Sequence, residues 1–260
     1  KLSMQPVIAT INALPQSERF IPTFNVYAAT LYNTLNYKDI TWYAEAARKS
    51  TDVILDQNGK LINADGSVYY TTIGWAPGKF GATLSGKRTE NFTLRTSPNE
   101  ILLRGFTNWQ PVIANIRPQR TIARYTPASN DLSELSGAAN LYYTPNDNYT
   151  FNGNYTHINT LSGVKLYREA YIDVEIHKFK KLNLHPGFQY LQYNQAIYQS
   201  KGTRTLTAYT PFIEAVYKIS EKRSIKTDLQ YMDMDGDYGS WIYALIEYDI
   251  APKWAFAISD

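Results

Sequence analysis

Apolar and polar side chains alternate along twelve stretches of the chain, most of them 9–13 residues long. The stretch Tyr167–Phe179 shows the pattern most clearly. One set of alternate positions holds Ala170, Ile172, Val174 and Ile176, and the other holds Glu169, Tyr171, Asp173, Glu175 and His177. Because successive side chains of a β-strand point to opposite faces of a sheet, the pattern predicts strands with one apolar and one polar face.

The connections between these stretches alternate between short and long. The short ones are Leu35–Asp39, Pro77–Lys79, Pro145–Asn148, Lys180–Asn183, Glu221–Arg223 and Ala251–Lys253. The long ones are Asp52–Gly66, Glu90–Leu132, Thr160–Val164, Ser200–Gly202 and Asp233–Gly239. Up-and-down transmembrane β-barrels have this rhythm, with short periplasmic turns at one end and longer outer loops at the other.

Strand length and aromatic residues favour a membrane barrel over the alternative, a soluble β-sandwich with one wet face per sheet. Soluble strands usually have about 5–6 residues, whereas membrane strands need about 9–11. Aromatic residues gather beside the short connections, where an interfacial girdle is expected: Trp75, Phe80, Tyr142, Tyr143, Phe179, Tyr217, Tyr248 and Trp254. The sequence therefore predicts an all-β fold, an antiparallel up-and-down transmembrane β-barrel, with residues 1–260 forming part of a single domain.

The last stretch, Trp254–Asp260, reads as half a strand, with Trp254, Phe256 and Ile258 on one face. A barrel does not leave a half-strand at its edge, because unpaired backbone groups are costly in lipid. We therefore expect the visible strands, about twelve, to be a fragment of a longer barrel with further strands on both sides.

The connection at residues 90–132 is too long for an ordinary loop. Ser97, Pro98, Asn99 and Glu100 form a capping box with proline at the first helical position, which predicts a short helix near residues 98–109. Residues 119–125 then read as a short strand. Two interpretations stay open: a rim loop packed on its neighbours, or an inward-folded plug or docking surface.

The composition limits the chemistry of the chain. It has no cysteine, which excludes thiol chemistry, thiolate metal sites and disulfides. Its formal net charge of +3 is too small to indicate a nucleic-acid partner. The chain has no run of about 20 mostly apolar residues, so the sequence does not predict a membrane-spanning helix. We expect no cofactor.

Polar residues on the strands are the candidate functional residues. The alternation places one set on the side of the sheet that would face the lumen of a barrel: Glu169, Asp173, Glu175, His177, Lys218, Lys226 and Asp228. Charged groups on one face of a sheet need water or partners, so this set indicates a wet interior.

Two weaker patterns concern metal binding and catalysis. Asp233, Asp235 and Asp237 resemble half of a calcium loop, but the bidentate glutamate at the twelfth position is missing. His157 and Asp233 both lie at the long-loop end of the predicted strands. An acid–base dyad depends on geometry that the sequence does not give, so a barrel hydrolase stays an alternative function.

Three segments carry a resemblance to a known family: residues 247–260, residues 142–145, and the insertion with the run 106–111. They resemble a family of uncharacterised outer-membrane β-barrels from Bacteroidetes-type bacteria, a domain of unknown function. The resemblance covers most of the chain and brings no catalytic residues with it. It implies further strands on both sides of this stretch.

Together these patterns predict a non-enzymatic protein of the bacterial outer membrane. It would serve as a porin-like transport channel or as a structural subunit of an envelope secretion or assembly complex. The expected partners are outer-membrane lipid, lipopolysaccharide and other envelope proteins. The alternatives are the barrel hydrolase and a soluble β-sandwich that binds carbohydrate through exposed Tyr and Trp side chains.

Overall fold

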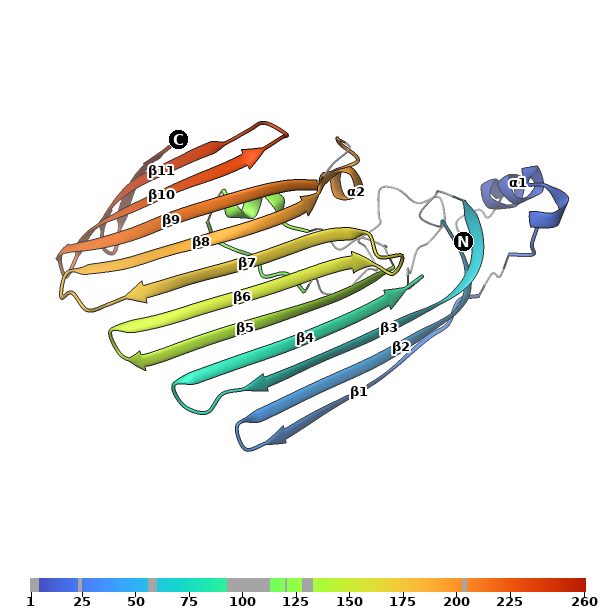
Figure 1. The fold of residues 1–260 in the computed structure, drawn as a ribbon, viewed down its shortest axis with the longest axis horizontal. Coiled ribbons are helices and arrows are strands. Elements are labelled where there is room, and N and C mark those ends of the chain that lie inside the picture. Colours follow the sequence, from blue (N-terminus) through green and yellow to red (C-terminus); the bar gives the residue numbers. More distant parts are fainter. Residues whose placement is uncertain are drawn as a thin grey trace.

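A computed structural model describes residues 5–22, 25–55, 60–92, 113–119, 121–127, 133–202 and 205–260. Twelve antiparallel strands form one sheet, and each strand pairs with its neighbours in chain order (Figure 1). The strands are β1 Ala28–Tyr37, β2 Ile40–Leu55, β3 Leu61–Trp75, β4 Phe80–Glu90, β5 Glu134–Asn146, β6 Tyr149–Thr160, β7 Lys165–Ile176, β8 Leu182–Asn194, β9 Thr205–Ser220, β10 Arg223–Asp235, β11 Trp241–Ile250 and β12 Trp254–Ser259. The prediction of an all-β, up-and-down antiparallel fold is confirmed, and the single sheet fits part of a barrel wall. A sandwich needs two facing sheets, so it does not describe this fold.

The two faces of the sheet are distinguished by what covers them. The inner face is the one on which residues 113–119 and 121–127 lie, and we call these residues the inner segment. In Figure 1 they lie behind β8 and β9, on the side toward which the sheet curls at its C-terminal end. The opposite face is the outer face.

Apolar side chains of the outer face are exposed, while polar side chains of the inner face are buried. On β7, Ile172 of the outer face is 62% exposed, whereas its inner-face neighbours Tyr171 and Asp173 are 3% and 7% exposed. On β11, the outer-face residue Ile242 is 74% exposed. The exposed outer face departs from a water-soluble protein, where exposed apolar patches are small. The inner face buries polar residues together with an apolar cluster that includes Leu191, Met232 and Tyr125.

The aromatic residues near the short turns are exposed as a group: Trp75, Tyr142, Tyr143, Phe179, Tyr217 and Trp254. Trp75 and Phe80, which flank the turn between β3 and β4, lie edge to face with ring centroids 5.4 Å apart. Exposed aromatic rings at strand ends are typical of the girdle at a membrane interface.

The connection expected at 52–66 is mostly strand. The register between β2 and β3 shifts between Lys49 and Asp52, and pairing then resumes as far as Leu55 and Leu61. The prediction was wrong because the shift interrupts the alternation without ending the strands. The extension buries Val53 and Leu61 against helix α1, Gln5–Ala13.

Two further short helices lie near this end of the sheet: η1, Gln16–Glu18, and α2, Gln195–Gln199. The sequence analysis did not predict α2, in which Asn194 caps the first turn by accepting a hydrogen bond from the backbone N–H of Ile197 at 3.2 Å. No helix among the described residues is long and apolar enough to cross a membrane.

The strand expected at 119–125 is instead a 3₁₀ helix, η2, Ile122–Tyr125. Its backbone bonds are local, since Ala123 N–H donates to Gln119 C=O at 2.9 Å. Ile122 and Tyr125, three residues apart, are both buried on the inner face. A spacing of three suits a 3₁₀ turn, in which residues i and i+3 eclipse. The helix expected near 98–109 lies outside the described residues.

Candidate functional site

The inner face of β6–β10 carries a network of buried polar side chains. Gln189 donates to Glu169 (Nε2 to Oε1, 2.7 Å), and Asn152 donates to Asp173 (Nδ2 to Oδ1, 2.7 Å). His185 Nε2 lies 3.3 Å from the same Asp173 oxygen. Buried polar groups are costly unless they are paired, so these contacts hold the carboxylates in place.

A second part of the network lies on β9 and β10. Lys226 Nζ is 2.6 Å from Glu214 Oε2, and Gln230 Nε2 donates to Asp228 Oδ2 at 2.8 Å. Gln230 is 2% exposed. Its amide oxygen is left to accept hydrogen bonds from outside the sheet.

The inner segment supplies these partners. The backbone N–H and the hydroxyl of Thr121 both donate to Gln230 Oε1, at 2.9 and 2.6 Å. Arg117 stacks on Tyr171, with its guanidinium carbon 3.7 Å from the ring centre, and its Nε lies 3.5 Å from Glu169 Oε1. Glu169 is 1% exposed, so the segment places a cation beside a buried anion.

A third anchor holds the segment at the long-loop end. Tyr125 donates to Asp237 (Oη to Oδ2, 2.7 Å), and Lys201 forms an ion pair with the other oxygen of Asp237. Burial acts to raise the pKa of Asp237, but the hydrogen bonds from Lys201, Tyr125 and Gln195 prevail and lower the pKa to about 2. The carboxylate is therefore ionised throughout the physiological pH range.

The expected polar residues share the inner face but not one environment. Glu169, Asp173 and Asp228 are buried among the network. At the short-turn end, Glu175 and His177 lie 3.4 Å apart with both side chains 44% exposed, and Lys218 is exposed. The alternation of the sequence correctly places these residues on one face of the sheet. That this face borders a lumen stays a prediction.

Arg117, Thr121 and Gln230, which join the inner segment to the sheet, were not among the predicted site residues. Gln230 was visible as a polar position on its strand, but nothing marked it as a partner of the insertion. The pattern of residues 119–125 indicated a short strand, and it gave no sign of these contacts.

Several buried polar atoms of the inner segment and of the inner face have no hydrogen-bond partner in the described structure. Among the described residues, Arg117 Nη2, Gln119 Oε1, Glu169 Oε2, Thr210 Oγ1 and Asp228 Oδ1 are buried and form no hydrogen bond. Two of these residues, Gln119 and Asp228, line a cavity of about 170 Å³ together with Lys226. It is large enough to hold several water molecules. The network is therefore built to be hydrated.

The three aspartates of the candidate calcium loop do not converge. Asp237 faces Lys201 and Tyr125, while Asp233 accepts a hydrogen bond from Ser240 Oγ at 3.2 Å. In the part of the chain that the structure describes, no group of three or more His, Cys, Asp or Glu side chains could hold a metal ion.

His157 and Asp233 are also far apart. His157 lies on β6 and Asp233 on β10, four strands away in the sheet. At about 4.8 Å per strand, the separation is about 19 Å. This pair does not form the acid–base dyad that the hydrolase alternative named.

Comparison with known proteins gives a family but no activity. Residues 14–260 match the model of a family described as "Family of unknown function (DUF6029)". No curated protein matches the chain.

Proposed function

We propose that the chain, which belongs to this family of unknown function, DUF6029, forms part of the wall of a non-enzymatic outer-membrane β-barrel. The inner segment occludes the lumen of this barrel. Such a barrel serves gated transport or acts as a structural subunit of an envelope secretion or assembly complex. The resemblance to Bacteroidetes-type outer-membrane barrels supports this location. Its partners are outer-membrane lipid, lipopolysaccharide and other envelope proteins.

One observation carries the proposal: apolar side chains are exposed on the outer face while polar ones are buried on the inner face. Ile172 and Glu169 on the same strand are 62% and 1% exposed. Exposing many large apolar residues to water would be costly, whereas in a bilayer they meet hydrocarbon. The strands, 10–16 residues from β1 to β11, are long enough to cross one at a tilt.

The inner segment supports an occluded barrel rather than an open porin. Arg117, Thr121 and Tyr125 tie it to β7, to β10 and to the β10–β11 loop. A segment fixed at three points across the inner face obstructs the space that a steady current would need.

Membrane fractionation tests the location. We expect the whole protein to sediment with membranes, to resist extraction by salt and high pH, and to need detergent to stay monodisperse. Recovery of a monodisperse protein in buffer without detergent would contradict a lipid-facing outer face.

Single-channel recording tests the occlusion. We expect the whole protein in a planar bilayer to be silent, and the triple variant Arg117→Ala, Thr121→Ala, Tyr125→Ala to conduct, because it frees the inner segment. Thr126→Ala is the matched control, since its hydroxyl donates to Ala123 C=O within the segment rather than to the sheet. A steady current through the unaltered protein would favour a porin instead.

A further inference from the structure

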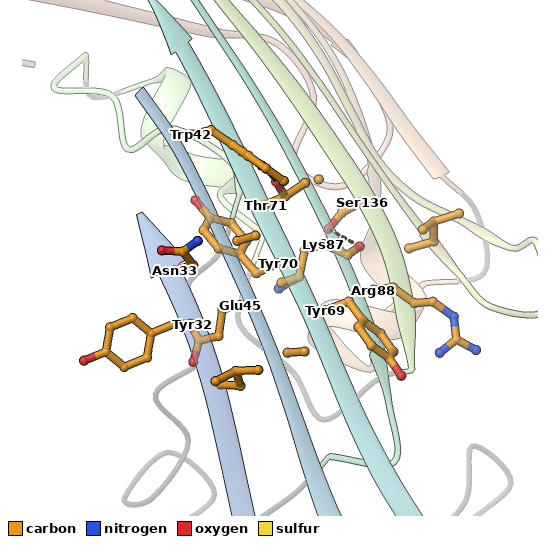
Figure 2. Close-up of a pocket in the computed structure, with 15 residues that line it drawn as sticks. Tyr32, Asn33, Trp42, Glu45, Tyr69, Tyr70, Thr71, Lys87, Arg88 and Ser136 are labelled. Carbon is orange, nitrogen blue, oxygen red and sulfur yellow. Dashed lines mark hydrogen bonds between the residues drawn. The ribbon is translucent and has the colours of Figure 1, made fainter. Parts of the chain in front are cut away.

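The outer face of β1–β5 has a groove of about 640 Å³ (Figure 2). Its floor is one row of paired residues that runs across the strands. The row consists of Asn33, Ala44, Thr71 and Gly86, each opposite the next in the register. These side chains are smaller than Trp42, Tyr69 and Arg88, which flank the row.

The two neighbouring rows form the walls. On one side lie Leu31, Ala46, Tyr69, Arg88 and Leu135, again paired strand to strand. On the other side lies Trp42, whose indole N–H donates to Thr71 Oγ1 at 2.9 Å. Figure 2 shows Trp42 reaching toward Thr71, with Tyr69 and Arg88 farther along the sheet. The hydrogen bond satisfies the polar atoms there and leaves an apolar channel.

Arg88 lies where a lipid headgroup would be. It is eight residues along β4 from Phe80 at the short turn, a distance of about 26 Å along the strand. At a strand tilt of about 40° this corresponds to about 20 Å of membrane depth, close to the far border of the apolar band.

The charge of Arg88 is available to a ligand. Arg88 Nη2 pairs with Glu90 Oε2 at 2.8 Å, but both side chains are 40–45% exposed, and exposed ion pairs contribute little. A guanidinium has five N–H donors, more than one carboxylate oxygen uses, and it matches the geometry of a phosphate.

We propose that this groove binds a phosphorylated acyl lipid of the outer leaflet, with an acyl chain along the small-residue row and a phosphate on Arg88. The inference rests on the proposed function, since it requires the outer face to meet lipid. It goes further because it assigns a specifically bound lipid to this groove, whereas the rest of the outer face would contact bulk lipids that exchange freely.

Native mass spectrometry of the whole protein released from detergent tests the acyl part, with lipid A as the probe. Gly86→Leu fills the groove, and the backbone tolerates a side chain there because an added Cβ meets only Thr71 Cγ2, at 3.8 Å. We expect the affinity for lipid A to fall by about tenfold, as when roughly two methylene groups lose their contact. Gly153→Leu is the matched control on the outer face of β6, where an added Cβ meets nothing within 4 Å.

Lipid A treated with phosphatase tests the phosphate part. We expect the unaltered protein to bind intact lipid A about fivefold more tightly than the dephosphorylated form, the factor expected for one basic side chain near a phosphate. Arg88→Gln should abolish that preference, while Arg168→Gln on the outer face of β7 should keep it.

Three outcomes would overturn the proposal: equal losses in Gly86→Leu and Gly153→Leu, an unchanged preference in Arg88→Gln, or a lipid-free dimer that Gly86→Leu dissociates. The last would assign the groove to a second copy of the chain. Each of these outcomes is distinct from failure of the proposed function. That failure would be seen in the fractionation experiment, as a protein that stays monodisperse without detergent.

Discussion

The outer and inner faces of the sheet solve opposite problems with the same strands. On the outer face, residues such as Ile172 and Ile242 are largely exposed. On the inner face, Glu169 and Gln230 are almost fully buried, and the inner segment supplies their missing partners. The outer face is therefore suited to lipid without help from the protein, whereas the inner face depends on a segment from elsewhere in the chain.

Strand β1 lies at the edge of the sheet, with one neighbouring strand and outside the reach of the inner segment. All ten of its residues are exposed, on both faces. Burial of polar groups therefore depends on neighbouring elements as well as on the pattern of the strand. Where the inner segment lies, it turns a wet polar face into a closed network.

The largest expected effect comes from removing the cation of the inner segment. Arg117→Leu leaves the Glu169 carboxylate, whose side chain is 0% exposed, without its charge partner. We expect a loss of about 4 kcal/mol in the free energy of unfolding in detergent, typical of a broken buried ion pair. Adding Glu169→Gln should recover part of that loss. The control is Arg168→Leu, because Arg168 precedes Glu169 in the sequence but lies on the outer face. A similar loss of stability in this variant would contradict the assignment of the effect to the inner-face ion pair.

A charge on the outer face should cost somewhat less. Ile172→Lys puts an ammonium near the middle of β7, where the apolar band is expected, and we predict a loss of about 3 kcal/mol in bilayers. Val164→Lys lies in the connection before β7 and is also exposed, so it should change little. If the outer face met water, both variants would be neutral.

Loss of one anchor of the inner segment should have a smaller, local effect. Tyr125→Phe removes the hydrogen bond to the ionised Asp237, a change of about 2 kcal/mol. We expect faster hydrogen exchange in residues 121–127 with little change in the strands. Tyr155→Phe, on the exposed outer face of β6, should leave the exchange of the segment unaltered.

The smallest expected effect is that of pH on the hydrogen bond between Tyr125 and Asp237. Because the folded-state pKa of Asp237 is lowered to about 2, its contribution is fully present above its ordinary pKa and is lost only as the pH falls through about 2. Hydrogen exchange of residues 121–127 should therefore be the same at pH 7 and pH 5 after correction for the intrinsic rate. Asp237→Asn should exchange faster than the unaltered protein at both values, and a difference that vanishes by pH 5 would contradict this assignment.

The strands were predictable because their period-2 pattern is a local property. The alternation of apolar and polar residues along β7 was enough to assign its two faces. Glu169, Asp173 and Asp228 lie on the expected face. The network that engages them was not predictable, because Arg117 and Thr121 meet partners on strands that are distant in the sequence, and the pattern of residues 119–125 indicated a strand rather than this contact. The extension of β2 and β3 past Lys49 was missed for a related reason: a register shift hides pairing from a pattern that assumes strict alternation.

Thr121 and its partner Gln230 are 109 residues apart in the chain. Neighbouring hairpins of the sheet form from local contacts, whereas this contact must wait until β7–β10 are assembled. The inner segment is thus synthesised well before the surface that receives it. Its insertion is expected to be a late step of folding, and any factor that assists the assembly of the protein would meet the segment while it is still outside.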